Sequence, residues 1–176
     1  KILQFSATNT SIQDITYLIP SLLVEKDDVE ITDLANEITK DIDKDYLGEY
    51  DKAEAIFKWI FENIEYDIES TDTLPRSAKG VLAEKKGTNE EVSYLFAALL
   101  RSSGIQSKLI KGTDSEDLHV WNEMLVNGKW FIVDVTWGSG YKNIDDDTIT
   151  KELDMSYFKA NRSIYENKFE MTILEY

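Results

Sequence analysis

The sequence contains no cysteine, and this absence excludes several classes of protein at once. Disulfide-stabilised folds, thiolate metal centres and enzymes with a cysteine nucleophile all need that side chain. The 176 residues include a single histidine, His119, so metal motifs built on two histidines are also excluded. Acid–base chemistry near neutral pH by an unperturbed side chain therefore depends on His119, and we expect neither a metal site nor a cofactor.

Positive charge and long apolar runs are also scarce. The chain has 19 Lys and Arg against 34 Asp and Glu, which gives a formal net charge of -15. This charge repels phosphate backbones, so we do not expect nucleic acid as a partner. The longest apolar stretch, residues 18–24, is interrupted by Pro20 and Ser21 and is shorter than the roughly 18 residues that a membrane helix needs. We therefore expect no transmembrane segment.

The sequence is typical of one domain. It has only 2 Pro and 8 Gly, and we find no repeat, low-complexity segment or long linker. A chain of this length buries about 70% of its surface, so its core needs no metal or disulfide. We divide it into an N-terminal helical extension (1–48), a core (49–140) and a C-terminal segment that completes the sheet (141–176). It begins at Lys1 rather than Met, which is compatible with a removed signal peptide or upstream domain.

Charge is unevenly distributed along the chain. Residues 76–113 carry 7 basic and 3 acidic side chains, whereas residues 25–75 carry 5 basic and 17 acidic ones. The basic stretch could bind an anion, but a solvated helix face is the simpler interpretation. The acidic stretches 114–117 and 145–147 could bind Ca²⁺, yet both lack the ligand spacing and the final glutamate of a calcium loop. We favour solvated acidic loops.

Apolar residues at helical spacing dominate the first two thirds of the chain. They predict helices over residues 31–42 and 51–65 and a short helical turn over residues 78–84. Thr88 and Glu91 then fit a capping box that opens a further helix with a single apolar stripe. Gly104 is expected to end that helix, because glycine adopts the left-handed conformation of a C-terminal cap.

Beyond this helix the apolar period changes from 3.6 residues to 2, which indicates strands. We predict them over residues 105–111, 119–126 and 129–136 and, at the C-terminal end, over residues 169–176. The pair Asn127-Gly128 between the second and third strands favours a type I′ hairpin, in which Val126 faces Lys129.

The hairpin register places a histidine beside an aspartate. It sets Trp121 opposite Asp134 and His119 opposite Thr136. Because side chains two residues apart share one face of a strand, His119 and Asp134 become diagonal neighbours with Cα atoms about 7 Å apart or less. The two side chains can therefore meet.

A histidine beside an aspartate is a known device for generating a base. An aspartate that accepts the Nδ1 proton fixes the tautomer and leaves Nε2 free to activate a nucleophile. A helix N-terminus suits that nucleophile, because its N–H groups stabilise a thiolate and an oxyanion. The turn Gly87-Thr88-Asn89 opens such a helix. From the pattern alone, a hydrogen-bonded structural histidine is the simpler interpretation.

Three motifs follow one another in these segments. They are Gly87-Thr88-Asn89 at a helix start, His119-Val120-Trp121-Asn122 in a strand and Asp134-Val135-Thr136-Trp137 at a strand end. Together they resemble the transglutaminase-like superfamily, in its bacterial papain-like branch, over roughly residues 50–140. The resemblance implies an α+β, papain-like fold in which N-terminal helices pack on an antiparallel β-sheet.

The resemblance also implies roles for individual residues. His119 matches the general base of the family, and Asp134 matches the acid that orients it. The position of the nucleophilic cysteine is occupied by Asn89. A carboxamide is not an acyl-transfer nucleophile, because its nitrogen lone pair is delocalised, and loss of the nucleophile alone removes nearly all covalent catalysis.

Three hypotheses follow. The first is a catalytically inactive transglutaminase-like domain, a binding or structural module of an exported or cell-surface bacterial protein, with a protein, peptide or cell-wall glycan as ligand. The second is an active thiol enzyme, a transglutaminase or cysteine peptidase, whose cysteine was replaced by Asn89 through engineering. The third is a hydrolase with a hydroxyl nucleophile at Ser93, one helical turn after Asn89; Thr88 is better explained as the helix cap.

Aromatic and amide side chains near the motifs could line a ligand groove. The predicted binding residues are Trp121, Asn122, Trp137 and Tyr141. Most aromatic residues belong more simply to the core. Trp137 and Tyr141 are the most exposed candidates, because they follow the last hairpin strand in a glycine-containing loop.

Overall fold

The computed structural model describes residues 15–42, 48–67, 70, 73–115, 118–142 and 149–175. The α-helices in this part of the chain are α1 (Val29–Thr39), α2 (Gly48–Asn63), α3 (Ala78–Glu84), α4 (Asn89–Ser102) and α5 (Arg162–Lys168), with 3-10 helices η1 (Thr16–Leu18), η2 (Trp137–Ser139) and η3 (Met155–Tyr157). None of the described helices is both long enough and apolar enough to cross a membrane.

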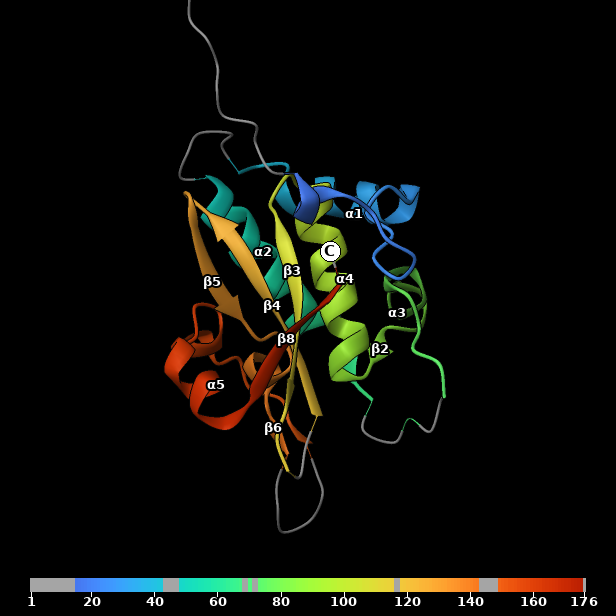
Figure 1. Cartoon of the computed structure of the whole chain (residues 1–176). Helices are drawn as coiled ribbons and strands as arrows, with labels where there is room; N and C mark the ends of the chain where they lie inside the picture. The colour runs from blue at the N-terminus through green and yellow to red at the C-terminus, as the bar shows by residue number, and fades with distance from the viewer. Residues whose placement is uncertain are drawn as a thin grey trace, which may run out of the picture.

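The strands form one main sheet and two small pairs. The main sheet is antiparallel, with the order β5 (Lys129–Val133), β4 (Leu118–Val126), β3 (Ser107–Thr113) and β8 (Glu170–Glu175). The small pairs are β1 (Glu65–Tyr66) with β2 (Lys86–Gly87), and β6 (Tyr141–Lys142) with β7 (Ile149–Thr150). Figure 1 shows β8, the last element of the chain, beside β3. The predicted C-terminal strand is therefore present.

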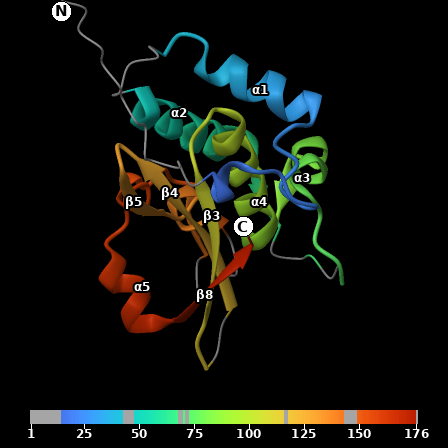
Figure 2. The ribbon, with the colours of Figure 1, turned by 45° about the horizontal axis from the view of Figure 1, so that its top comes forward.

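Helix α4 occupies the centre of the molecule. Figure 2 shows it between the sheet and the helices α1, α2 and α3. All residues from Glu91 to Arg101 are buried. The sequence predicts a single apolar stripe on this helix. In the structure the other elements cover all sides of the helix, not only the stripe. Its buried polar residues are hydrogen-bonded: Arg101, for example, donates to the carbonyl oxygen of Ser107. Such partners are what allow polar groups into a core.

The N-terminus of α4 has the predicted capping box. The Thr88 side-chain oxygen accepts a hydrogen bond from the Glu91 backbone N–H at 3.4 Å, and the Glu91 carboxylate accepts one from the Thr88 N–H at 2.9 Å. Gly104 follows the helix with a φ angle of +83°, as a left-handed C-terminal cap requires. Both predicted boundaries of this helix are confirmed.

A Thr88→Ala variant is expected to lower the free energy of unfolding by about 1 kcal/mol, because an N–H in the first turn of α4 loses its acceptor. Urea denaturation followed by circular dichroism measures the loss. The matched control is Thr88→Ser, which keeps the hydroxyl and should retain most of the stability. Equal losses in the two variants would show that the methyl group of Thr88, rather than the cap, is what matters.

The hairpin between β4 and β5 has the predicted turn. Asn127 and Gly128 have φ angles of 51° and 74°, the positive pair that a type I′ turn needs. Val126 pairs with Lys129, so the predicted register is confirmed.

The predicted strand over residues 129–136 is wrong at its C-terminal end, because β5 stops at Val133. The backbone N–H of Asp134 donates to the carbonyl oxygen of Tyr157, 3.0 Å away, instead of to β4. Trp121 therefore has no strand partner in β5. The chain leaves the sheet at Asp134 because the backbone N–H of this residue is hydrogen-bonded to the segment around η3.

Several other predicted boundaries also shift. Helix α2 covers Gly48–Asn63 rather than residues 51–65. Helix α1 begins at Val29 rather than residue 31, because the Asp28 side chain caps it by accepting from the Glu30 N–H at 2.9 Å. Strand β3 begins at Ser107 rather than residue 105. The backbone N–H of Ile105 still donates to Leu100 at the end of α4, so it belongs to the helix cap.

The sheet separates two apolar clusters. The larger one, on the α4 side, contains the buried faces of α1 to α4. The smaller one contains Ile110, Trp121, Ile132, Tyr165 and Phe169. Trp121 lies so close to Gly112 of β3 that a Cβ atom there would be 2.5 Å from its ring. Only glycine fits at this position. The two clusters together cover both faces of β4.

Candidate functional site

The histidine and the aspartate meet as predicted. His119 lies near the start of β4, Asp134 directly follows β5, and the His119 Nε2 is 2.6 Å from the Asp134 Oδ2. Both side chains are buried. The predicted ring nitrogen is wrong, however, because Nε2 and not Nδ1 contacts the carboxylate.

The carboxylate of Asp134 is held by four donors. Its Oδ2 also accepts from the Tyr165 hydroxyl at 3.0 Å, and its Oδ1 accepts from the Thr136 hydroxyl and the Trp137 backbone N–H, each at 3.0 Å. The last two contacts explain the spacing of the Asp-x-Thr-Trp motif. Its four residues form a tight turn in which the side chain of the first residue accepts hydrogen bonds from the third and the fourth. The position of the carboxylate is therefore fixed from both sides.

Tyr165 is not among the predicted site residues. Burial raises the pKa of its phenol, and the negative charge of Asp134 raises it further. The hydroxyl therefore remains protonated and donates to the carboxylate. Tyr165 belongs to α5, 31 residues from Asp134, and no motif marks it. Only the packing of α5 against the sheet brings it to the site.

Two predicted binding residues are not in a cleft. Trp121 and Asn122 are both 0% exposed. Trp121 packs under the His119 ring in the smaller apolar cluster, with ring centres 5.9 Å apart. Asn122 points to the other face of β4 and donates to the carbonyl oxygen of Ser93 at 3.1 Å. Both act in the core, because β4 is an interior strand covered on both faces.

A cleft of about 1230 Å³ opens beside the His119–Asp134 pair. Its lining includes Asn89 at the start of α4, His119 and Trp137, three of the predicted site residues. Trp137 stacks on the His119 ring with centres 4.4 Å apart and an angle of 12°. The side chain of Tyr141, also predicted here, lies outside the described part of the structure.

Several hydroxyl groups near the site, that of Ser93 among them, are occupied by structural hydrogen bonds. The Ser93 Oγ is 2.8 Å from the Asn89 carbonyl oxygen and 3.1 Å from the Val120 carbonyl oxygen, and Ser93 does not line the cleft. Of the lining residues, Thr88 caps α4 and Ser139 donates to a backbone carbonyl at 2.6 Å. The geometry therefore disfavours a serine nucleophile at position 93.

Comparison with known proteins agrees with this arrangement. The model of the transglutaminase-like superfamily matches residues 32–135. The chain belongs to the transglutaminase-like superfamily. The family inferred from the three motifs and the predicted α+β, papain-like fold are thereby confirmed.

The transglutaminase-like domain also resembles individual proteins. It is 26% identical over 145 residues to the kyphoscoliosis peptidase of Mus musculus and 28% identical over 137 residues to that of Homo sapiens. These matches cover 74% and 69% of the chain but 22% and 20% of the relatives, so the chain spans about a fifth of their length.

Among solved structures, a candidate cysteine protease of Cytophaga hutchinsonii superposes with a TM-score of 0.61 at 23% identity. The superposition covers 93% of this chain and 52% of that one. It establishes a shared fold.

A cluster of charged side chains around Arg76 includes one residue of the cleft lining, Asp67. The guanidinium of Arg76 lies 2.7 Å from Asp67, 2.7 Å from Glu84 and 3.0 Å from Glu91. The hydrogen bond from Arg76 holds the pKa of Asp67 below its usual range. The cluster ties the first turn of α4 to the preceding loop. It also explains part of the basic stretch 76–113, where Arg76 pairs with acids of this domain and is not free for an external anion.

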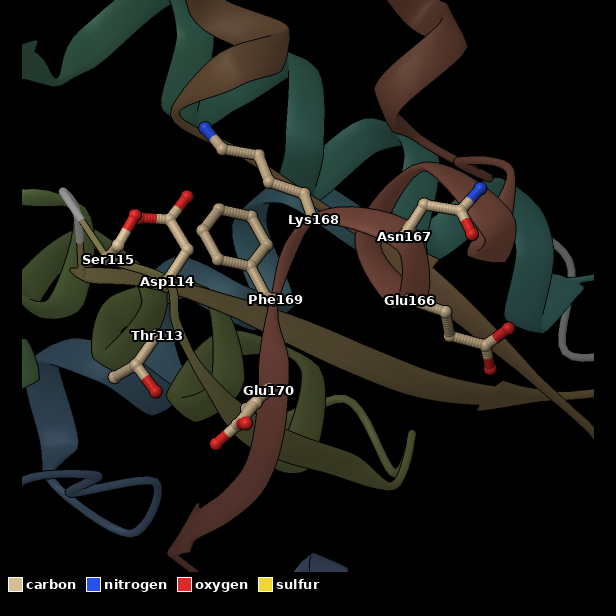
Figure 3. Close-up of a pocket in the computed structure, with 8 residues that line it drawn as sticks. All are labelled: Thr113, Asp114, Ser115, Glu166, Asn167, Lys168, Phe169 and Glu170. Atoms are coloured by element: carbon tan, nitrogen blue, oxygen red, sulfur yellow. The ribbon is translucent and has the colours of Figure 1, made fainter.

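A smaller hollow of about 490 Å³ lies where β8 begins, beside the end of β3 (Figure 3). It is lined by residues 113–115 and 166–170. In Figure 3 the side chains of Glu166 and Asn167 point away from those of Asp114 and Ser115. Its polar groups therefore do not converge on one point, as those of a binding site do.

We found no metal centre in the described ranges: no three His, Asp or Glu side chains there are grouped to hold an ion. The acidic residues 145–147 lie outside the described residues, as do residues 116 and 117 of the stretch 114–117.

Proposed function

We propose that this transglutaminase-like domain is catalytically inactive and binds its ligand in the cleft beside α4. The observation that carries the proposal is the position of Asn89. It lines the same cleft as His119, at the first residue of α4, where acyl transfer in this family needs a thiol. A carboxamide can form hydrogen bonds with a ligand there, but it cannot attack an acyl group.

The cleft remains suited to binding. Its volume of about 1230 Å³ exceeds that of typical small-molecule sites and can hold several side chains of a peptide. The intact pair of His119 and Asp134 is compatible with loss of catalysis, because a buried carboxylate with four partners also stabilises the fold. We include a protein, a peptide and a cell-wall glycan as ligand classes, in an exported or cell-surface bacterial protein.

A second candidate is an active thiol enzyme whose cysteine was replaced by engineering. Two observations favour it: the His119–Asp134 hydrogen bond of 2.6 Å, and the similarity to proteins named as peptidases. The natural gene distinguishes the two. An asparagine codon at position 89 supports the inactive module, and a cysteine codon overturns it.

The unmodified domain is expected to form no covalent adduct that depends on His119. A fluorophosphonate probe, which traps activated serines, followed by intact-protein mass spectrometry tests this expectation. The control is His119→Gln, which removes the base. A probe adduct on the wild type that disappears in His119→Gln would contradict the proposal and restore a hydroxyl nucleophile such as Ser93.

A further inference from the structure

We propose that the cleft binds a cationic peptide segment, one that carries lysine or arginine, in preference to a neutral or acidic segment. This inference rests on the proposed binding function and specifies its ligand. The observation behind this preference is the set of carboxylates that line the cleft. They come from two separate parts of the chain: Glu65 and Asp67 near β1, and Glu152 and Asp154 after β7.

The segment around β1 offers one uncompensated carboxylate to the cleft. Asp67 is paired with Arg76 at 2.7 Å and with Lys86 at 3.4 Å, so its charge is largely balanced. Glu65 is exposed and forms no ion pair among the described residues. Tyr66, between them, is 40% exposed, an unusual exposure for a large aromatic ring. A carboxylate next to an exposed phenol ring is a favourable surface for a cation.

The segment after β7 offers two further carboxylates. Asp154 caps η3 by accepting the Ser156 N–H at 2.8 Å, and hydrogen bonds from Ser156 lower its pKa, so it stays charged. Glu152 is exposed and, among the described residues, has no ion-pair partner. Among the described residues of the lining, Lys151 is the one Lys or Arg, and its ammonium lies 5.4 Å from the centre of the Phe61 ring.

Carboxylates from two segments line the same concave site and act together. A cleft with low-dielectric surroundings focuses their field, and the net charge of the whole chain, -15, has the same sign. A cation in the cleft is attracted to both segments, whereas an anion is repelled by both. This charge pattern gives specificity for a basic segment.

The floor of the cleft holds a further polar group for such a ligand. His119 is 3% exposed and lines the cleft, and Asp134 holds its Nε2. Its Nδ1 has no hydrogen-bond partner among the described residues. A ring nitrogen without a partner at the surface of the cleft favours a ligand that can hydrogen-bond to it, such as a peptide backbone.

Isothermal titration calorimetry of the wild-type domain with three capped pentapeptides tests the inference. The peptides are identical except for two positions, which are lysine, glutamine or glutamate. The lysine peptide is expected to bind tightest in 150 mM salt. The variant Glu65→Gln/Glu152→Gln should weaken it about fivefold, since each exposed ion pair contributes a modest amount.

The matched control is Asp33→Asn/Glu37→Gln, which removes the same charge from exposed residues of α1, outside the cleft. We expect it to change the affinity less than twofold. Equal weakening in both variants would overturn the inference, because the net charge alone would then explain binding. Equal affinity for the lysine and glutamine peptides would overturn it as well.

Failure of this inference and failure of the proposed function give different results. If the glutamine or glutamate peptide binds in the cleft and is recovered intact, the domain is an inactive binder with another preference. If the lysine peptide binds best but is recovered cleaved or acylated, as mass spectrometry of the titrated sample would show, the charge preference stands and the inactivity is wrong.

Discussion

An Asn89→Cys variant is expected to react with iodoacetamide about tenfold faster at pH 6 than an exposed reference thiol. The new thiol lies at the N-terminus of α4 and in the cleft that His119 lines, two features that lower the pKa of a cysteine. A pKa near 6 makes half of the thiol reactive at that pH, against about 0.3% for a thiol of pKa 8.5. The lower intrinsic reactivity of a less basic thiolate removes about a factor of ten from that advantage.

Two further variants separate the causes. A short capped cysteine peptide supplies the reference thiol of ordinary pKa, and Ser163→Cys, an exposed position in the first turn of another helix, α5, controls for the effect of a helix N-terminus. Asn89→Cys/His119→Gln keeps the first turn of α4 and removes the imidazole. Alkylation rates measured from pH 5 to pH 9 give each thiol pKa. If Asn89→Cys reacts no faster than Ser163→Cys, the site has lost more than its nucleophile.

An Asp134→Ala variant is expected to lower the free energy of unfolding by about 3–5 kcal/mol, because several buried donors lose one acceptor at once and each costs about 1–3 kcal/mol. The change leaves His119, the Tyr165 hydroxyl and the Trp137 N–H buried without their acceptor. Each such orphaned group adds a desolvation penalty. Urea denaturation followed by tryptophan fluorescence measures the loss.

The control for Asp134 is Tyr165→Phe, which removes one of the four donors and leaves the carboxylate in place. It should lower the free energy of unfolding by about 1 kcal/mol. A loss in Asp134→Ala no larger than that in Tyr165→Phe would contradict the structural role. A large loss, in contrast, gives a reason for a domain to keep Asp134 after catalysis is gone.

Several features of this site follow from the sequence because short-range rules encode them. The cap formed by Thr88 depends on a residue only three positions away, and the hairpin register depends on a two-residue turn. The meeting of His119 with Asp134 follows from that register. The substitution at Asn89 is likewise visible from one position in one motif.

The tertiary structure alone decided the surroundings of these residues. No local pattern shows that β4 is covered on both faces, so the burial of Trp121 and Asn122 could not be foreseen. Tyr165 reaches the carboxylate from a helix near the C-terminus. The carboxylates that line the cleft, such as Glu65 and Glu152, come from segments far apart in the chain.

The sequence by itself therefore determined that this domain has a transglutaminase-like fold with a histidine, an aspartate and no thiol. The structure decided which ring nitrogen remains available, which aromatic rings are core and which charges line the cleft. The physical reason is the range of the interactions. Caps, turns and strand registers depend on neighbours within a few residues, whereas burial and electrostatic environment depend on segments that only the folded chain brings together.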